Sequence, residues 1–464
     1  MGQGSKHGLA EESGASEGPT AKSARTAGSE QAEVAATGSE LYYEEGGLQR
    51  IRPYFHKYAA HAKGRWVGRT VFDVFSREFR DRSTGYYEAA IERGLIEING
   101  QRVAKDAVVQ NNDLITHHIH RHEPPVATQP IRVVAQTAEG LLVVDKPASI
   151  PVHPSGRYNY NSVTQILESR HGFKKVFPAN RLDRLTSGLL LVGLNAAVAR
   201  RLEQGLRHHR IQKEYVCKVA GNFPRERVVC DEPIRVVAHK LGLNCVDRAQ
   251  GKPSLTEFQW LCDDGQQSIV YCRPKTGRTH QIRVHLQYLG FPIANDPLYH
   301  NAEVWGQQMG KGGALPAAEP AAASAAAAPD SDKASEASKA TGRPAKKMIG
   351  KRDDDQCNAT WQHLVARMAE WKDRQNQAEH DQCVSAGDSG VCGVCEWPAM
   401  PDPTPDQLCI WLHAWRYSGR GWSYETDFPA WAQDAAALVD AVKYRAEAES
   451  RSPSPSPSPS PTSK

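Results

Sequence analysis

The stretch Asn180-Arg-Leu-Asp-Arg-Leu-Thr-Ser-Gly188 decides how the rest of this chain is interpreted. It places one carboxylate, Asp183, between two arginines and ends at a glycine before the apolar run from Leu189 to Val192. This run is too apolar for the surface and predicts a buried strand. Because neighbouring cations favour the ionised carboxylate, the pKa of Asp183 should lie below its usual range. These nine residues fit a functional acid and a structural ion pair equally well.

The bulk composition limits the class of protein. A chain of 464 residues is too long for one core and predicts two or three folded units with tails. Lys and Arg total 57 and Asp and Glu 53, so any nucleic-acid footprint has to be local. The 10 cysteines lack a framework spacing, which favours free thiols in a reducing compartment. The sequence also lacks an apolar segment long enough for secretion or membrane spanning. We therefore expect an intracellular protein without a membrane partner, with the cytoplasm or nucleus favoured over the mitochondrion or plastid.

A small folded unit is predicted over residues 48–126, after a disordered tail at 1–47. Its first part interleaves basic and aromatic side chains such as Lys57 and Tyr58, a composition that suits RNA binding but is more often a solvated basic face. Apolar spacing then predicts two helices, followed by strands that include a hairpin at Asn99-Gly100. The helices are expected at 71–79 and 86–91, and the strands at 95–99, 102–103 and 113–117.

Four histidines, His117, His118, His120 and His122, lie close together at the end of this unit. Alternation along a strand would divide them between two faces, and neither Cys nor paired carboxylates complete a tetrahedral set. We therefore predict that they do not bind a metal ion.

A second unit begins near residue 127 and contains the opening stretch. Strands are predicted at 131–135 and 141–144, and a helix at 163–170. After Val192, Asn195 is a suitable N-cap for a helix whose polar side and exit carry the densest basic patch of the chain, including Arg200, Arg201 and Arg207.

Further strands and one helix follow the basic patch. The alternating segment from Lys213 to Val219 predicts a strand with Tyr215 on the same face as Lys213. Strands at 256–260 and 268–272 lead into a helix with Ile282 facing inward, Arg283 on the other face, and Gly290 at its end.

The C-terminal third is expected to leave the second unit and return to it. Residues 307–352 are rich in Ala, Gly and Pro and predict a flexible insertion. A helical stripe from Trp361 to Trp371, sheet segments at 408–417 and 421–424, and a helix at 430–444 should then complete the unit. Cys392-Gly-Val-Cys395 leaves zinc as a weaker alternative, because a closed site needs four ligands and only two are well spaced. We predict no metal.

Four ordered motifs over roughly 170 residues resemble those of an RluA-type RNA pseudouridine synthase. They are Asp145-Lys-Pro with Val152-His-Pro, Arg181-Leu-Asp-Arg with Thr186-Ser-Gly, Lys213-Glu-Tyr, and Lys275-Thr-Gly-Arg-Thr-His-Gln-Ile-Arg-Val-His285. The resemblance is greatest to the eukaryotic branch with an N-terminal S-four-like RNA-binding module. It implies an α+β fold with a mixed, largely antiparallel central sheet and flanking helices, plus a small N-terminal α/β module, and no cofactor.

The resemblance also implies the roles of individual residues. Asp183 is the catalytic aspartate, Arg283 pairs with it and keeps it ionised, and Tyr215 stacks on the target base and takes part in proton removal from C5. Arg181 fills the space left by the extruded base, which fits the need to take a base out of the stack before chemistry can reach it. The expected RNA-binding residues are Arg181, Arg184, Arg278, His280, Arg200, Arg201 and Arg207, with Arg77, Arg80, Arg82 and Arg93 on the N-terminal module.

One residue departs from the family pattern, since Asn180 stands where the family usually has His before Arg-Leu-Asp. The sequence therefore leaves two functions in competition. One is an RNA pseudouridine synthase acting on structured RNA, with tRNA favoured over rRNA or mRNA and the enzyme acting as a monomer. The other is a catalytically inactive RNA-binding or assembly factor that keeps the fold.

The expected organisation follows from these assignments. Residues 1–47 form a tail, 48–126 the S-four-like module, 127–306 the catalytic domain, 307–352 the insertion, 353–448 the part that completes the catalytic domain, and 449–464 a Ser-Pro tail.

Overall fold

The computed structural model describes residues 40–79, 84–239, 241–315, 359–385 and 401–439, with backbone only for 359–360 and 376–385. The predicted tails, the insertion, Arg80, Arg82 and the Cys392-Gly-Val-Cys395 pair lie wholly or largely outside these residues. Within the described part, no helix is both long and apolar enough to cross a membrane.

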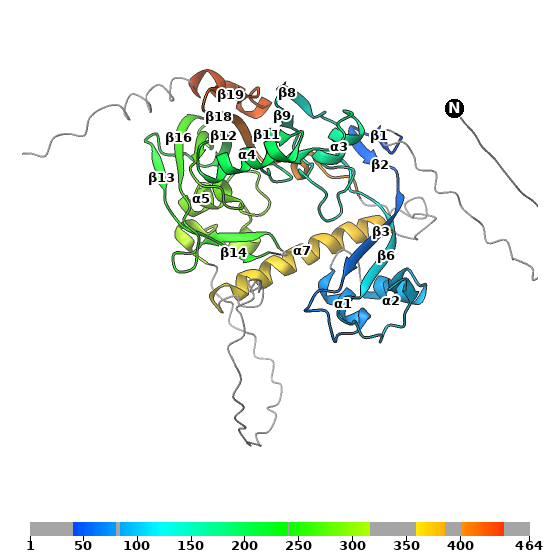
Figure 1. Cartoon of the computed structure of the whole chain (residues 1–464). Helices are drawn as coiled ribbons and strands as arrows, with labels where there is room; N and C mark the ends of the chain where they lie inside the picture. The colour runs from blue at the N-terminus through cyan, green and yellow to red at the C-terminus, as the bar shows by residue number, and fades with distance from the viewer. Residues whose placement is uncertain (1–39, 80–83, 240, 316–358, 386–400, 440–464) are drawn as a thin grey trace, which may run out of the picture. The chain divides into compact units, whose positions relative to one another are not determined.

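A ten-stranded sheet forms the centre of the fold (Figure 1). Its strands are β8 (Arg132–Gln136), β9 (Leu141–Lys146), β10 (Phe177–Pro178), β11 (Ser187–Gly193), β12 (Gln212–Ala220), β13 (Val228–Cys230), β16 (Thr256–Asp263), β17 (Gln267–Pro274), β18 (Leu412–Gly419) and β19 (Trp422–Glu425). The order is β13-β16-β17-β12-β18-β11-β9-β8, with β10 beside β11 and β19 beside β18. Among these strands only β11 and β18 pair in parallel, so the sheet is mixed and largely antiparallel, as predicted.

The return of the C-terminal third to the sheet is confirmed by β18. This strand lies between β12 and β11, in the middle of the sheet, although more than 190 residues separate it from either of them in sequence. Leu412, Ala414 and Tyr417 of β18 are buried in the main core. The sheet therefore needs the segment beyond the insertion to close its centre.

Helices accompany the central sheet, and the predicted ends of two of them are confirmed. They are α3 (Val163–Ser169), α4 (Ala196–Arg207), α5 (Gln281–Leu289), α6 (Ala302–Trp305), α7 (Ala359–Ser385) and α8 (Pro405–Leu408), with 3-10 turns η1 (Lys311–Gly313) and η3 (Ala430–Ala435). Asn195 caps α4 by accepting a hydrogen bond from the N–H of Val198, and Gly290 ends α5 in the left-handed region, both as predicted.

Helix α5 is buried on more than its apolar face. We expected Ile282 to face inward and Arg283 to lie on the other face, and the structure buries both faces, since residues Gln281 to Gln287 are all buried. The reason is that Ile282 joins the main core while Val284, on another side of the helix, packs in a second core with Trp361 and Leu364 of α7. The stripe predicted on α7 therefore packs on the core, as expected, and covers the helix that carries Arg283.

A separate four-stranded sheet holds the N-terminal helices. Its order is β3-β6-β4-β5, and it packs with α1 and α2 around Val74, Phe75 and Ile96. Asn99 and Gly100 adopt the positive φ values of the predicted hairpin turn. Strand β3 was not predicted, and the last strand continues through the histidine run to Arg121. The bounds are α1 (Val71–Glu78), α2 (Thr84–Glu92), β3 (Tyr54–His61), β4 (Ile96–Ile98), β5 (Gln101–Arg102) and β6 (Leu114–Arg121).

Two small sheets correct further details. The tail predicted at 1–47 is wrong at its end, because β1 (Tyr42–Glu45) pairs with β2 (Leu48–Ile51), which pairs with β7 (Val126–Ala127). The apolar residues of β1 are few and lie among glutamates and glycines, but Tyr42 packs on the main core.

Strands β14 (Ile234–Ala238) and β15 (Leu243–Val246) form a separate pair. Residues 291–299 meet the central sheet through an isolated bridge between Val219 and Ile293. The helix predicted at 430–444 starts as η3 and is described to residue 439.

Candidate active site

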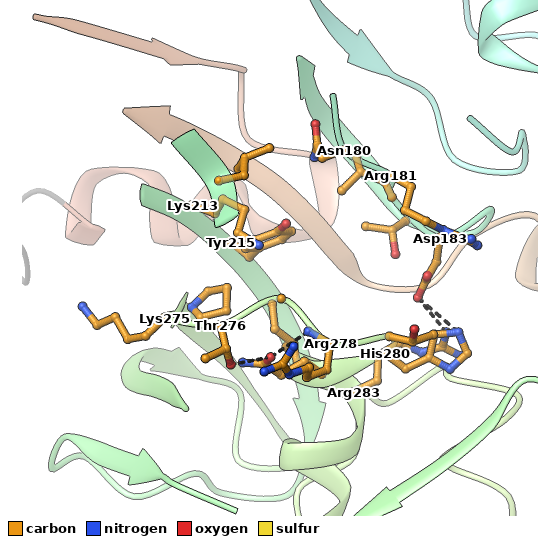
Figure 2. A pocket seen from close by; sticks show the side chains of 18 of the residues that line it. Asn180, Arg181, Asp183, Lys213, Tyr215, Lys275, Thr276, Arg278, His280 and Arg283 are labelled. Carbon is orange, nitrogen blue, oxygen red and sulfur yellow. Dashed lines mark hydrogen bonds and ion pairs between the residues drawn. The ribbon is translucent and has the colours of Figure 1, made fainter. Parts of the chain in front are cut away.

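A cavity of about 660 Å³ opens between the motif loop that follows β10, the end of α4, β12 and the start of α5 (Figure 2). Its size is in the range of cavities that hold a small organic ligand. The three predicted catalytic residues, Asp183, Tyr215 and Arg283, all line it, together with Arg181, Arg207, Arg278 and His280. Residues a hundred positions apart in the sequence are thus brought to one site.

A buried lysine, Lys146, holds the loop that carries Asp183 through a hydrogen bond to its backbone. The Lys146 ammonium is fully buried and donates hydrogen bonds to the carbonyl oxygens of Pro147, Ile150 and Arg184, at 2.8, 2.9 and 3.3 Å. At the end of the loop Gly188 has a φ of +107°, and a Cβ there would collide with the backbone of Ala414 in β18. The lysine of one motif and the glycine of another therefore fix where Asp183 stands.

Asp183 is bound on one side and open on the other. Arg283 Nη1 donates a hydrogen bond to its Oδ2 at 2.9 Å, and His280 Nε2 lies 3.6 Å from the same oxygen, as the dashed lines in Figure 2 show. Among the residues that the structure describes, none donates a hydrogen bond to Oδ1. One carboxylate oxygen is therefore fixed, and the other is available to a ligand in the cavity.

The two partners of Asp183 are themselves anchored by one short segment. Asp296, whose side chain is fully buried, accepts two hydrogen bonds from Arg283, at 2.7 Å from Nε and 2.9 Å from Nη2. Tyr299, three residues on, has its hydroxyl 2.8 Å from His280 Nδ1. Neither Asp296 nor Tyr299 was predicted from the sequence as a site residue.

The charges of the site favour an ionised Asp183. Burial alone would raise the pKa of Asp183, but His280 in its protonated form, the Arg283 guanidinium and the Arg283 hydrogen bond lower it below its usual range. Burial, with the nearby Arg283 charge, lowers the pKa of His280 to about 4, so its imidazole is uncharged at neutral pH. Arg283 therefore supplies the positive charge under ordinary conditions. His280 also adopts left-handed backbone angles, a strained conformation of the kind that gathers at functional sites.

The arginines next to Asp183 in the sequence are not its main partners, which corrects the simplest interpretation of the motif. The predicted direction of the Asp183 pKa is right, but Arg181 contributes less than His280 or Arg283. Arg181 is exposed at the cavity, whereas Arg184 lies over the ring of Tyr158, 5.4 Å from its centroid. The structural ion pair considered from the sequence is therefore not formed within the motif.

Tyr215 enters the cavity from β12 with its hydroxyl held from behind. Its Oη lies 2.9 Å from the hydroxyl of Tyr417 in β18, which accepts a hydrogen bond from Asn180 Nδ2 at 3.2 Å. Burial raises the pKa of Tyr215 well above its usual range and that of Tyr417 to about 12. The unusual residue of the motif thus connects to Tyr215 through a tyrosine that the sequence analysis did not single out.

Cations surround the rest of the cavity. Lys213 and Tyr215 both line the cavity, so they lie on one face of β12, as strand alternation predicted. Lys213 has no hydrogen-bond or ion-pair partner among the described residues. Burial lowers its pKa to about 8. Gln281 holds the loop before α5 by accepting hydrogen bonds from Thr276 Oγ1 and the Arg278 N–H.

Not every predicted RNA-binding residue lies at the cavity. Arg184, Arg200, Arg201, Arg77 and Arg93 do not line it. Arg200 and Arg201 are exposed on α4, while Arg77 forms an ion pair with Asp73 on α1 at 2.6 Å. The described residues hold no group of three or more His, Cys, Asp or Glu placed to bind a metal ion.

Comparison with known proteins identifies the family. A family model described as RNA pseudouridylate synthase matches residues 140–288, which include Asp183, Tyr215 and Arg283. The pseudouridylate synthase RPUSD2 of Homo sapiens is 42% identical over 413 residues, covering 85% of this chain and 75% of the human protein. The chain belongs to the RluA-type RNA pseudouridine synthase family. The synthase therefore isomerises uridine to pseudouridine in RNA, and its sheet is that of the pseudouridine synthase fold.

Two further relatives extend the match. The tRNA pseudouridine(32) synthase, mitochondrial, of Saccharomyces cerevisiae is 39% identical, covering 84% of the synthase and 78% of the yeast protein. RNA pseudouridine synthase 7 of Oryza sativa subsp. japonica is 36% identical, with 84% and 92% covered. The expected preference for the cytoplasm or nucleus gains no support from them, because the yeast relative is named as mitochondrial.

Proposed function

We propose that the synthase modifies uridines in tRNA and that Asp183 is its catalytic residue. The observation that carries this proposal is the asymmetric environment of the Asp183 carboxylate. Oδ2 is fixed by Arg283, whereas Oδ1 has no protein donor among the described residues, and Asp183 lines the cavity. An ionised oxygen with no hydrogen bond to give up is suited to attack an electron-poor carbon or to stabilise charge that develops there.

The reaction moves the base within one nucleotide. The target uridine leaves the RNA stack and enters the cavity, a step that costs a few kcal/mol. Asp183 attacks or assists while the bond from N1 to the sugar breaks, the base turns, and C5 forms the new bond to the same sugar carbon. The proton on C5 is then released, and Tyr215 stacks on the base and takes part in that proton removal. Arg181, exposed at the mouth, fills the space in the RNA.

The charge of the cavity suits a polyanion. Within the described part of the chain, Asp183 is the single carboxylate of the lining, against six arginines and lysines. Lys213, Lys275 and Arg278 lie on the side away from the Asp183 loop (Figure 2). We assign these cations to the phosphates that flank the target uridine, since phosphate contacts position a nucleic acid on a protein.

The tRNA substrate is supported by the name of the yeast relative. We propose that the sheet β3-β6-β4-β5 with α1 and α2 is the S-four-like module and that it adds RNA contacts through Arg77 and Arg93. The purified synthase should release tritium from tRNA labelled at uridine C5 and much less from separated rRNA or mRNA. Release from rRNA or mRNA at the rate seen with tRNA would contradict this choice.

The catalytic assignment is tested with Asp183→Asn. This change keeps the shape of the side chain and its contact with Arg283 but removes the ionised oxygen. We expect tritium release to be abolished while the affinity for labelled RNA stays unchanged. A variant that turns over would overturn the role of Asp183. If the wild-type protein binds RNA but releases no tritium from any pool, the inactive RNA-binding factor is the better description.

A further inference from the structure

A chain of hydrogen bonds runs behind the cavity from Asn180 to Tyr215. Asn180 Nδ2 lies 3.2 Å from the Tyr417 hydroxyl, which lies 2.9 Å from the Tyr215 hydroxyl. Tyr417 is fully buried in the centre of β18, and Tyr215 is 7% exposed. The three residues come from the motif loop and from the two central strands β12 and β18, so the chain of contacts joins parts that fold together only in the complete sheet.

The direction of the first hydrogen bond is fixed by chemistry. An amide nitrogen donates and does not accept, so Tyr417 has to be the acceptor from Asn180. The orientation of the Asn180 amide is set at its other end, where Oδ1 faces the N–H of Leu191 at 3.4 Å. Rotating the amide by half a turn would place an NH2 group against that N–H, which disfavours the reverse assignment.

The direction of the second hydrogen bond follows from burial. The hydroxyl hydrogen of Tyr417 needs an acceptor, because a buried polar group without one costs free energy. Tyr417 does not line the cavity, and Tyr215 Oη is its other hydrogen-bond partner among the described residues. Tyr417 therefore donates to Tyr215. The hydroxyl hydrogen of Tyr215 is then left to point into the cavity, which Tyr215 does line.

We propose that Tyr417 is a positioning residue for the isomerisation, and that Asn180 sets the direction in which Tyr417 donates. The inference rests on the proposed role of Tyr215. In this arrangement Tyr215 directs its O–H into the cavity, and the hydrogen bond from Tyr417 fixes the ring that stacks on the uracil while the C5 proton is removed. It also explains why Asn180 is compatible with activity, since its amide donates one hydrogen bond, as a neutral histidine N–H would.

The test compares two substitutions of Asn180. Asn180→Asp has nearly the same shape and can still accept from Leu191, but an ionised carboxylate cannot donate. Tyr417 would then donate to the carboxylate and accept from Tyr215, and the hydrogen would be withdrawn from the cavity. Asn180→His keeps a donor. With total RNA tritiated at uridine C5, we expect single-turnover release to slow about tenfold in Asn180→Asp, the value of one hydrogen bond, and to stay within about twofold in Asn180→His.

Tyr417→Phe tests whether Asn180→Asp acts through this chain of hydrogen bonds, which we call the relay, or through a direct effect of the new negative charge at position 180 on Asp183. It removes only one hydroxyl, and we expect release to slow about tenfold with unchanged RNA affinity. Adding Asn180→Asp to Tyr417→Phe should cause little further loss, because the two changes act through the same hydroxyl. If Asn180→Asp slows release as strongly in the Tyr417→Phe background as it does in the wild type, or if both single variants react at the wild-type rate, the proposal is overturned. Tyr215→Phe is the control for its premise: full activity there would instead refute the role of Tyr215.

Discussion

At the residue scale, the Asp183 carboxylate is held by partners that line the cavity, and these are oriented in turn by side chains that do not reach it. Asp296 orients Arg283, and Arg283 in turn fixes Asp183 Oδ2. Tyr299 orients His280, the second neighbour of the same oxygen. The pair Asp296 and Arg283 is buried deeply, with side chains 0% and 6% exposed, whereas the Asp183 side chain is 22% exposed. We therefore expect Asp296 to contribute mainly to stability and Asp183 mainly to the chemistry, although both carboxylates bind Arg283.

Replacing each carboxylate by its amide should show this division. Asp296→Asn leaves the guanidinium of Arg283 without its bidentate partner in a buried position, and we expect the free energy of unfolding to fall by about 3–5 kcal/mol. Asp183→Asn should change it by about 1 kcal/mol or less, since that carboxylate is partly solvated and its own burial is costly. Urea denaturation of both variants measures the difference. Equal losses of stability would contradict the separate roles.

At the element scale, the site depends on the parallel contact between β11 and β18. Gly188 pairs with Ala414 there, directly after the motif loop, and its backbone has a φ of +107°. The absence of a Cβ lets the strand that carries Tyr417 approach the strand that follows Asp183. A side chain at position 188 would therefore disturb the loop and the relay together.

We predict that Gly188→Ala destabilises the protein by several kcal/mol, through a clash with backbone that cannot move away cheaply. Gly421→Ala is the matched control, because Gly421 also has a positive φ of +79° but open space where a Cβ would stand. It should cost only about 1 kcal/mol, from backbone strain alone. Thermal unfolding compares the two. If both variants lose the same stability, close packing at Gly188 is not the reason for the glycine.

The elements also show what the sequence could and could not predict. Strands β9, β11 and β12 and helix α4 were expected because their periodicity is local, and β18 was expected as a sheet segment. Its place between β12 and β11 has no local signal, because it depends on pairing across the insertion. For the same reason Asp183, Tyr215 and Arg283 were predicted by their motifs, whereas the contacts of Tyr417 with Tyr215 and of Asp296 with Arg283 form only in the folded protein. Strand β3 was missed because its exposed, basic and aromatic residues resemble a surface loop.

At the scale of the whole molecule, three exposed arginines lie on the helix whose end reaches the cavity. Arg200, Arg201 and Arg207 lie on the exposed side and end of α4, and Arg207 reaches the cavity lining. The net charge of the chain is only +4, so RNA attraction has to come from such local groups.

Neutralising this helix should reduce the salt dependence of RNA binding. For Arg200→Gln, Arg201→Gln and Arg207→Gln together, we expect the slope of log affinity against log salt to become shallower by about 2, since each lost phosphate contact removes about 0.9. Filter binding from low to high salt provides the measurement, with exposed Arg420→Gln as a control. An unchanged slope would remove α4 from the RNA footprint.

Buried histidines should make the fold sensitive to acid. Burial lowers the pKa of His280 and of His413 from 6.5 to about 4. Between these values the unfolded chain binds protons that the native chain does not, so the free energy of unfolding should fall as the pH drops through this window. Ser187 and Thr426 hold the His413 ring through hydroxyl contacts at 2.8 and 2.7 Å.

His413→Gln keeps hydrogen-bonding groups for both hydroxyls but cannot titrate. The free energy of unfolding should therefore change less steeply between pH 6.5 and 4 in this variant than in the wild type. His153→Gln, at an exposed position, should leave the pH dependence as it is. A His413→Gln profile parallel to that of the wild type would show that His413 is not a source of the acid sensitivity.

The central claim, that this chain makes pseudouridine in tRNA through Asp183, is tested most directly by mapping pseudouridine in cells that lack the protein. The account predicts that specific tRNA positions lose pseudouridine, that the wild-type chain restores them, and that Asp183→Asn, expressed at the same level, does not. Restoration by Asp183→Asn, or tRNA positions that keep their pseudouridine without the protein, would contradict it.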